Sequence, residues 1–218
     1  MSRIIVATNP ANDAVTQYLD AWQTEVVNLA KNQKDTIIFE LNKEKTNKKD
    51  LIELIKEKNP QLVILNGHGS YDSVFGFDGS VLIKADENND ILIRRIVHSL
   101  TCSSGKVLGS SCIKIGTLAY IGYKEEFKIA YLNNRNTKEE KFNDEIAGLF
   151  LEPAFEAIFS LIRGCSALEA FHDSQKKYLK NLNFAIAANN PGLNTAVAPR
   201  LYHNFIHQVC LGDGSACF

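Results

Sequence analysis

Residues 62–70 read LVILNGHGS and residues 97–105 read VHSLTCSSG, and these two stretches decide the predicted fold. In each of them a short run that favours a strand, Leu62–Leu65 or Val97–Leu100, is followed at once by glycine or small polar residues. Leu62–Leu65 is apolar at every position, which is typical of a strand in a parallel sheet covered by helices on both faces. We therefore predict two buried strands of one sheet, the first ending at Gly67-His68-Gly69 and the second at Thr101-Cys102.

The rest of residues 1–125 alternates strand and helix patterns around these two strands. Further strands are expected at Ile4–Ala7, Thr36–Leu41 and Thr117–Gly122, with one or two hairpins in Val74–Ile93. Helices are expected after Asn9-Pro10 (an N-cap followed by proline at the first helical position), at Lys49–Lys58 and at Lys106–Ile113. Repeated strand–helix units predict an α/β fold with a mostly parallel central sheet and helices on both faces.

The remainder of the chain is predicted to be mainly helical. A helix through Phe142 and Phe150 is expected to break at Pro153, and further helices are expected to end at Gly164, to begin at Ser166 and to span Ala198–Val209. Phe184–Ala187 is compatible with a sixth strand. We predict one domain over residues 1–218, in which an exposed loop at Asn133–Lys141 separates the sheet-forming part, residues 1–132, from the helical part, residues 142–218.

Composition excludes several classes of protein. The 218 residues are 45% hydrophobic with a net charge of −1, which argues against disorder and against a nucleic-acid-binding protein with a basic face. No run of apolar residues is long enough for a membrane span, and the apolar run after Arg3 is too short for a signal peptide, so we expect a cytoplasmic protein. The five cysteines are odd in number and none forms a CxxC pair, so no disulfide framework, metal site or other cofactor is expected.

Two reactive side chains follow the two decisive strands. Ligands of open α/β sheets bind beyond the carboxyl ends of the strands, where His68 and Cys102 would lie side by side. Cysteine chemistry needs an acid–base partner and backbone N–H groups for a developing oxyanion, and the glycines beside His68 leave such groups free. The helix expected after Cys102 would favour the thiolate. His98 is a weaker competitor for the role of base.

These motifs resemble the caspase-like (clan CD) cysteine peptidases. The resemblance rests on VILNGHGS, IVHSLTCSSG and TLAYIGY in this order, with LIRGCSALEAF and the closing LGDGSACF adding to it, and it is nearest in character to the gingipain and CHAT-type bacterial branch. Many relatives carry alanine immediately before the nucleophile, where this chain has Thr101. The resemblance implies a three-layer caspase-like sandwich and a cysteine endopeptidase without a required third catalytic residue.

The resemblance also implies roles for individual residues. Cys102 would attack the scissile carbonyl, His68 would protonate the leaving amine, and the backbone N–H groups of Gly69 and Cys102 would form the oxyanion hole. The partner would be a protein or peptide substrate, with a regulatory protein partner as a further expectation. Enzymes of this kind are commonly cut near the region of residues 133–141.

Cleavage is expected after Arg or Lys, because acids follow the strands that border the specificity pocket in this fold. Asp13 lies beyond the first strand, and Glu125 and Glu126 lie beyond the strand that follows Cys102. A pocket carboxylate would pair with a guanidinium group. The alternative for Asp13 is that it complements the N-terminus of the first helix, and the alternative for the glutamates is that they face solvent. A non-catalytic caspase-like interaction module and a cysteine amidase or acyltransferase stay open as alternative functions.

Overall fold

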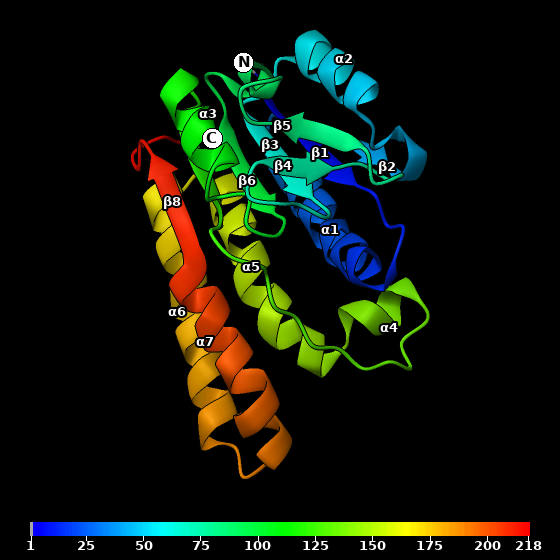
Figure 1. Cartoon of the computed structure of the whole chain (residues 1–218), viewed down its shortest axis with the longest axis vertical. Helices are drawn as coiled ribbons and strands as arrows, with labels where there is room; N and C mark the ends of the chain where they lie inside the picture. The colour runs from blue at the N-terminus through cyan, green and yellow to red at the C-terminus, as the bar shows by residue number, and fades with distance from the viewer. Residues whose placement is uncertain (1) are drawn as a thin grey trace.

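The computed structural model describes residues 2–218 and has a central sheet of six strands (Figure 1). In spatial order the strands are β2 (Thr36–Asn42), β1 (Arg3–Asn9), β3 (Leu62–Asn66), β6 (Ile96–Leu100), β7 (Ala119–Tyr123) and β8 (Gln208–Gly212). The first five run parallel and β8 pairs antiparallel with β7. A separate antiparallel hairpin consists of β4 (Ser73–Phe75) and β5 (Val81–Lys84).

Seven α-helices accompany the strands in the described chain. They are α1 (Ala14–Asn32), α2 (Lys48–Lys58), α3 (Leu108–Ile115), α4 (Lys138–Phe142), α5 (Glu145–Arg163), α6 (Ala167–Ala187) and α7 (Ala198–His207). Short turns of 3-10 helix occupy Lys43–Lys45 and Asn89–Leu92, and a π-helical turn occupies Leu193–Val197. No helix among residues 2–218 combines the length and the apolar character that a bilayer span needs.

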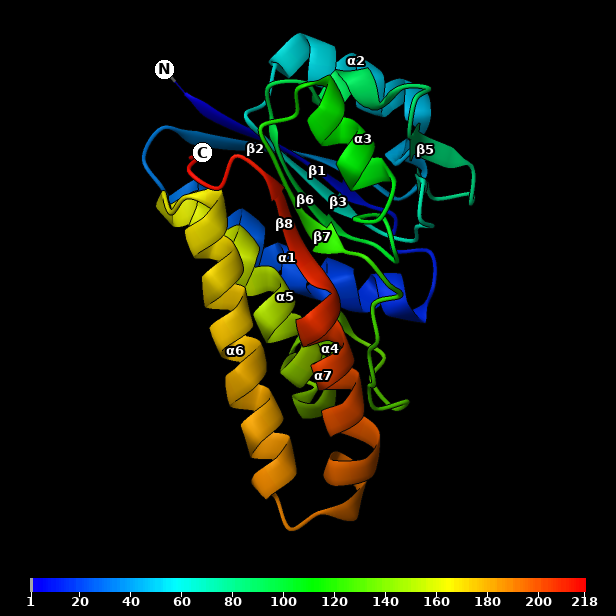
Figure 2. The same cartoon turned by 60° about the vertical axis from the view of Figure 1, so that its left-hand side comes forward.

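The sheet separates two apolar cores, as the predicted α/β class requires. On one face Ile64 packs with side chains of α1, α5 and α6, and on the other Val63 and Leu65 pack with those of α2, α3 and the hairpin. Every residue of β3 and of β6 is buried, which explains why β3 is apolar up to Asn66, while β6 also buries His98 and Ser99. Figure 2 shows the two layers on opposite sides of the sheet, with α6 and α7 extending together well beyond it.

Three expectations about helices are wrong. The first helix begins at Ala14 and not after Asn9, because Asp13 is its N-cap and forms a capping box with Thr16. Helix α5 continues through Pro153, because the carbonyl of Leu149 that proline leaves without a donor accepts a hydrogen bond from Asn181 Nδ2 (2.9 Å). The third expectation concerned the C-terminal part of the chain.

In the C-terminal part, a segment expected to be a strand is helical, and the end of the last expected helix is a strand. Phe184–Ala187 is the last turn of α6 and lies at the end of the α6–α7 pair, away from the sheet. The last helix stops at His207, and the chain enters the antiparallel edge strand β8 directly. The predicted loop at 133–141 is exposed over most of its length, but its last part forms α4, and Lys141 is buried with its Nζ donating to the carbonyls of Arg135 (2.9 Å) and Asn136 (3.0 Å).

Candidate active site

The turn after β3 presents His68 at the carboxyl edge of the sheet. Gly67 has φ +143°, a conformation that favours glycine, and a Cβ there would approach Pro10 Cγ to 3.2 Å. The backbone after it is tied to the β4–β5 hairpin, because the Phe75 N–H donates to the carbonyl of His68 (3.0 Å) and the Ser70 N–H to that of Ser73 (2.8 Å). The histidine side chain is thereby held on a short rigid turn and remains about half exposed to solvent.

A buried network of hydroxyl groups supports the turn that carries Cys102. Ser99 Oγ lies 2.8 Å from Thr101 Oγ1 and 3.0 Å from Ser104 Oγ, Thr101 donates to Ser104 (2.7 Å), and Tyr120 donates to Ser104 (2.9 Å). Hydrogen bonds in such a closed network satisfy one another away from water and fix the backbone between their ends. Thr101, the residue that departs from the pattern of many caspase-like peptidases, is therefore part of what holds Cys102 in place.

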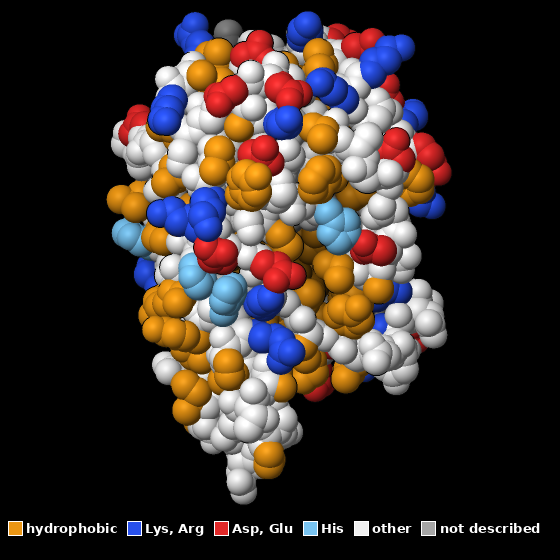
Figure 3. Space-filling model, in the orientation of Figure 1, with side chains coloured by type: hydrophobic (Ala, Val, Ile, Leu, Met, Phe, Trp, Pro, Cys, Tyr) orange, Lys and Arg blue, Asp and Glu red, His pale blue; other side chains and the backbone are white. Residues whose placement is uncertain are grey.

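The histidine turn and the cysteine turn are in direct contact. A Cβ added to Gly69 would lie 2.9 Å from the Cys102 carbonyl oxygen and 2.9 Å from both Cβ and Oγ1 of Thr101, closer than side chains pack. His68 and Cys102 also line one cleft of about 240 Å³. Its apolar lining comes from Val15, Leu19, Leu100, Phe127 and Ile129. Figure 3 shows a hollow with apolar walls on this face of the molecule, bordered by histidine and acidic side chains.

Asp13 contacts His68, a pairing that the sequence analysis did not anticipate. Its Oδ1 accepts a hydrogen bond from the Thr16 N–H (2.8 Å) as the N-cap of α1, and its Oδ2 pairs with His68 Nε2. Partial burial would raise the pKa of the Asp13 carboxyl, but the hydrogen bonds from Thr16 and His68 outweigh it and hold that pKa below its usual value. The position of Asp13 beyond a strand of the same sheet edge was the available sequence signal.

The surroundings of Cys102 disfavour the thiolate form of its side chain. Burial raises its pKa above the ordinary value, the backbone N–H of Phe127 partly offsets this, and the charges of Glu126 and Lys128 act in opposite directions. The expected help from a helix N-terminus is absent, because α3 begins only at Leu108. The thiol therefore needs a base to become a nucleophile.

The two backbone N–H groups that the sequence analysis assigns to an oxyanion hole have no hydrogen-bond partner in the described part of the chain. Within residues 2–218 neither the Gly69 nor the Cys102 N–H donates a hydrogen bond, although neighbouring residues of both turns form backbone hydrogen bonds. Gly69 faces Val74 as a bridge pair whose hydrogen bonds are made by the flanking residues, which leaves its own N–H unpaired. Free donors next to a nucleophile are what an oxyanion hole requires.

The acids predicted for a specificity pocket lie in three different settings. Asp13 is engaged with His68 and Thr16, Glu125 pairs with Lys106 (3.1 Å) and does not line the cleft, and Glu126 lines the cleft while paired with Lys128. His98 points into the core and is fully buried, which lowers its pKa to about 4, so it stays neutral away from the cleft.

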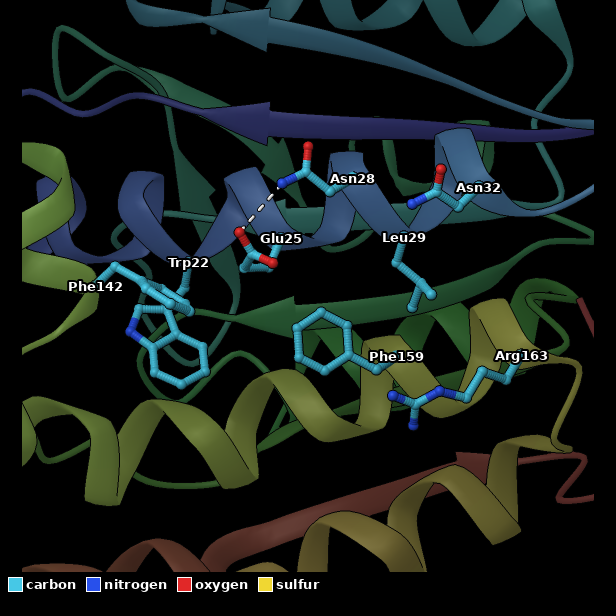
Figure 4. Close-up of a pocket in the computed structure, with 8 residues that line it drawn as sticks. All are labelled: Trp22, Glu25, Asn28, Leu29, Asn32, Phe142, Phe159 and Arg163. Carbon is cyan, nitrogen blue, oxygen red and sulfur yellow. Dashed lines mark hydrogen bonds between the residues drawn. The ribbon is translucent and has the colours of Figure 1, made fainter.

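A second groove, of about 380 Å³, lies between α1 and α5 (Figure 4). Trp22, Leu29 and Phe159 form its apolar part, and Asn28 donates a hydrogen bond to Glu25 on its rim (3.2 Å). None of its lining residues is a nucleophile or a histidine. Unlike the cleft of His68 and Cys102, this groove therefore does not combine a thiol with an imidazole.

Comparison with known proteins agrees at the level of the fold. No protein-family model matches the chain, and no curated protein matches it. Among solved structures it is similar to the crystal structure of the Arg-specific cysteine proteinase gingipain R, with a TM-score of 0.62 and 13% sequence identity over 99% of this chain and 47% of that chain. The chain thus spans about half the length of that protein. The similarity shows that this chain has the caspase-like α/β fold. Within the predicted resemblance it supports the gingipain branch and does not support the CHAT-type branch.

Proposed function

We propose that the protein is a cysteine endopeptidase in which Cys102 is the nucleophile and His68 the general acid–base. The observation that carries the proposal is the contact between the two turns, which places His68 and Cys102 in one cleft next to two unpaired backbone N–H groups. Asp13 holds one nitrogen of the His68 ring, so the other nitrogen, Nδ1, is available for proton transfer. The fold shared with a cysteine proteinase supports the same reaction class.

The reaction follows from these positions. His68 removes the Cys102 proton when substrate fills the cleft, and the sulfur attacks the scissile carbonyl carbon while the Gly69 and Cys102 N–H groups bind the oxyanion. The tetrahedral intermediate collapses, the C–N bond breaks, and His68 gives its proton to the leaving amine. A water then loses a proton to His68 and attacks the thioester, which releases the acid and regenerates the Cys102 thiol. Asp13 stabilises the imidazolium that forms in both halves.

We propose further that cleavage follows Arg or Lys. The aliphatic stem of such a side chain would pack on the apolar walls of the cleft, and its charged head would reach Glu126 at the rim. The structurally similar gingipain R is described as Arg specific, which supports this choice. The pocket roles of Asp13 and Glu125 stay predictions. Of the three acids, Glu126 is the one that lines the cleft without contacting His68 or Cys102, since it pairs with Lys128.

A panel of fluorogenic peptides tests substrate class and specificity together. Peptides with Arg, Lys, Asp, Asn or Leu before the cleavable bond are compared on the wild type and on Cys102→Ala. We expect cleavage after Arg and then Lys by the wild type alone. Faster cleavage after Asp or Leu refutes the basic preference, and turnover of small amides but not of peptides favours the amidase alternative. A regulatory protein partner and a cytoplasmic location stay predictions.

A further inference from the structure

The cleft wall formed by residues 126–129 belongs to a segment with no helix or strand of its own. It leaves β7 at Tyr123 and runs along the cleft, where Phe127 and Ile129 supply apolar lining. One anchor is local to the cysteine turn, because the Ser103 N–H donates to the carbonyl of Glu125 (3.1 Å). A segment without regular hydrogen bonding needs further partners to hold a defined position.

Helix α7 provides those partners. Asn204 Oδ1 accepts from the Lys128 N–H (2.8 Å) and Asn204 Nδ2 donates to the Lys128 carbonyl (2.7 Å), so one side chain satisfies both backbone groups of Lys128. His203 Nε2 donates to the Glu126 carbonyl (3.0 Å), and the Lys124 N–H donates to the His207 carbonyl (2.9 Å). Together these contacts bind the wall along one side of α7.

Asn204 stands out among these residues because it is fully buried inside a helix. Asparagine is a poor helix former, and a buried amide is costly unless its donor and acceptor are both used. Here both are used, and both on the backbone of the cleft wall. Apolar packing of α7 alone would be served better by leucine or alanine at this position.

We infer that Asn204 is a positioning residue for substrate binding, fixing the wall of residues 126–129 so that α7 sets the width of the cleft. The inference rests on the proposed function and deepens it. It also gives a role to the α6–α7 pair, which extends beyond the sheet (Figure 2) while contacting the candidate active site through α7.

Kinetics of Asn204→Ala beside Asn183→Ala provide the test. Asn183 lies exposed on α6, so its variant controls for loss of an asparagine. Loss of two hydrogen bonds to the wall should raise KM for the best peptide of the panel about tenfold, with kcat changed less than about threefold. Iodoacetamide is too small to need the wall for binding, so alkylation of Cys102 should slow by no more than about threefold, through a weaker contact of the Phe127 N–H with the thiol. The amides of residues 126–130 should exchange hydrogen faster.

His203→Ala serves if Asn204→Ala does not fold, because the half-buried His203 makes a single hydrogen bond to the wall, to the Glu126 carbonyl. This variant should raise KM about threefold. Unchanged KM in a folded Asn204→Ala protein overturns the inference. A raised KM accompanied by comparable falls in kcat, in the rate of alkylation and in the melting temperature also overturns it, because these changes would assign Asn204 a general structural role. A wild-type protein that cleaves no peptide of the panel overturns the proposed function instead, a result visible before any variant is compared.

Discussion

Replacing Gly69 with alanine tests the contact on which the candidate site depends. The new methyl carbon would lie 2.9 Å from three atoms of Thr101 and Cys102, against about 3.5–4.0 Å for an ordinary contact, so the two turns must separate by about 0.6–1 Å. A displacement of about 1 Å between catalytic groups costs about a hundredfold in rate. Overpacking of this kind also lowers the free energy of unfolding by about 1–3 kcal/mol.

The assay is kcat on the best peptide of the panel, measured with the melting temperature of each variant. Gly148→Ala is the control, because a Cβ there would meet its nearest atom only at 4.0 Å and alanine favours the α5 helix. We expect the control to keep full activity with equal or higher stability, and Gly69→Ala to lose about a hundredfold in kcat. A Gly69→Ala protein with wild-type kcat would show that the two turns are not in contact during catalysis.

Three further predictions concern charge, thiol reactivity and maturation. Asp13→Asn keeps an equally good N-cap but removes the charge beside His68, so kcat should fall about tenfold. The folded-state pKa of Asp13 is lowered, so its charge stabilises the fold above the ordinary carboxyl pKa and this stabilisation is lost as pH falls through the folded value; the unfolding free energies of wild type and variant should therefore converge at acidic pH, below that value. Alkylation of Cys102 by iodoacetamide should keep rising above pH 9, because burial raises its pKa; a plateau below pH 8 would contradict this. Residues 133–141 should be cut in the wild type and intact in Cys102→Ala, and identical single masses would refute self-cleavage.

The sequence predicted those parts of the fold that local patterns determine. Leu62–Leu65 was identified as a central strand because burial on both faces favours apolar residues throughout, and Val97–Leu100 was identified as another although it also buries His98 and Ser99. The edge strand β8 was missed because it has one neighbour, is only partly buried and follows α7 without a turn. Continuation of α5 through Pro153 depends on Asn181, a residue of another helix that no local pattern links to it.

The candidate site divides in the same way. His68 and Cys102 could be placed at one edge because parallel strands of a sheet end together. The pairing of Asp13 with His68 spans 55 positions and the clamp of Asn204 on Lys128 spans 76, so both arise from tertiary packing alone. The sequence therefore predicted the reactive groups, while the groups that orient them and shape the cleft emerged only from the structure.

Labelling with a peptidyl acyloxymethyl ketone tests the central claim most directly. The reagent reacts with an activated cysteine that can bind a peptide, and intact mass followed by peptide mapping identifies the residue modified. We predict one adduct, on Cys102, in the wild type and in a Cys112→Ala control, a much slower reaction in His68→Ala, and none in Cys102→Ala. An adduct on one of the other four cysteines, or no adduct on a folded wild-type protein, would contradict the assignment of Cys102 and His68 as the catalytic pair.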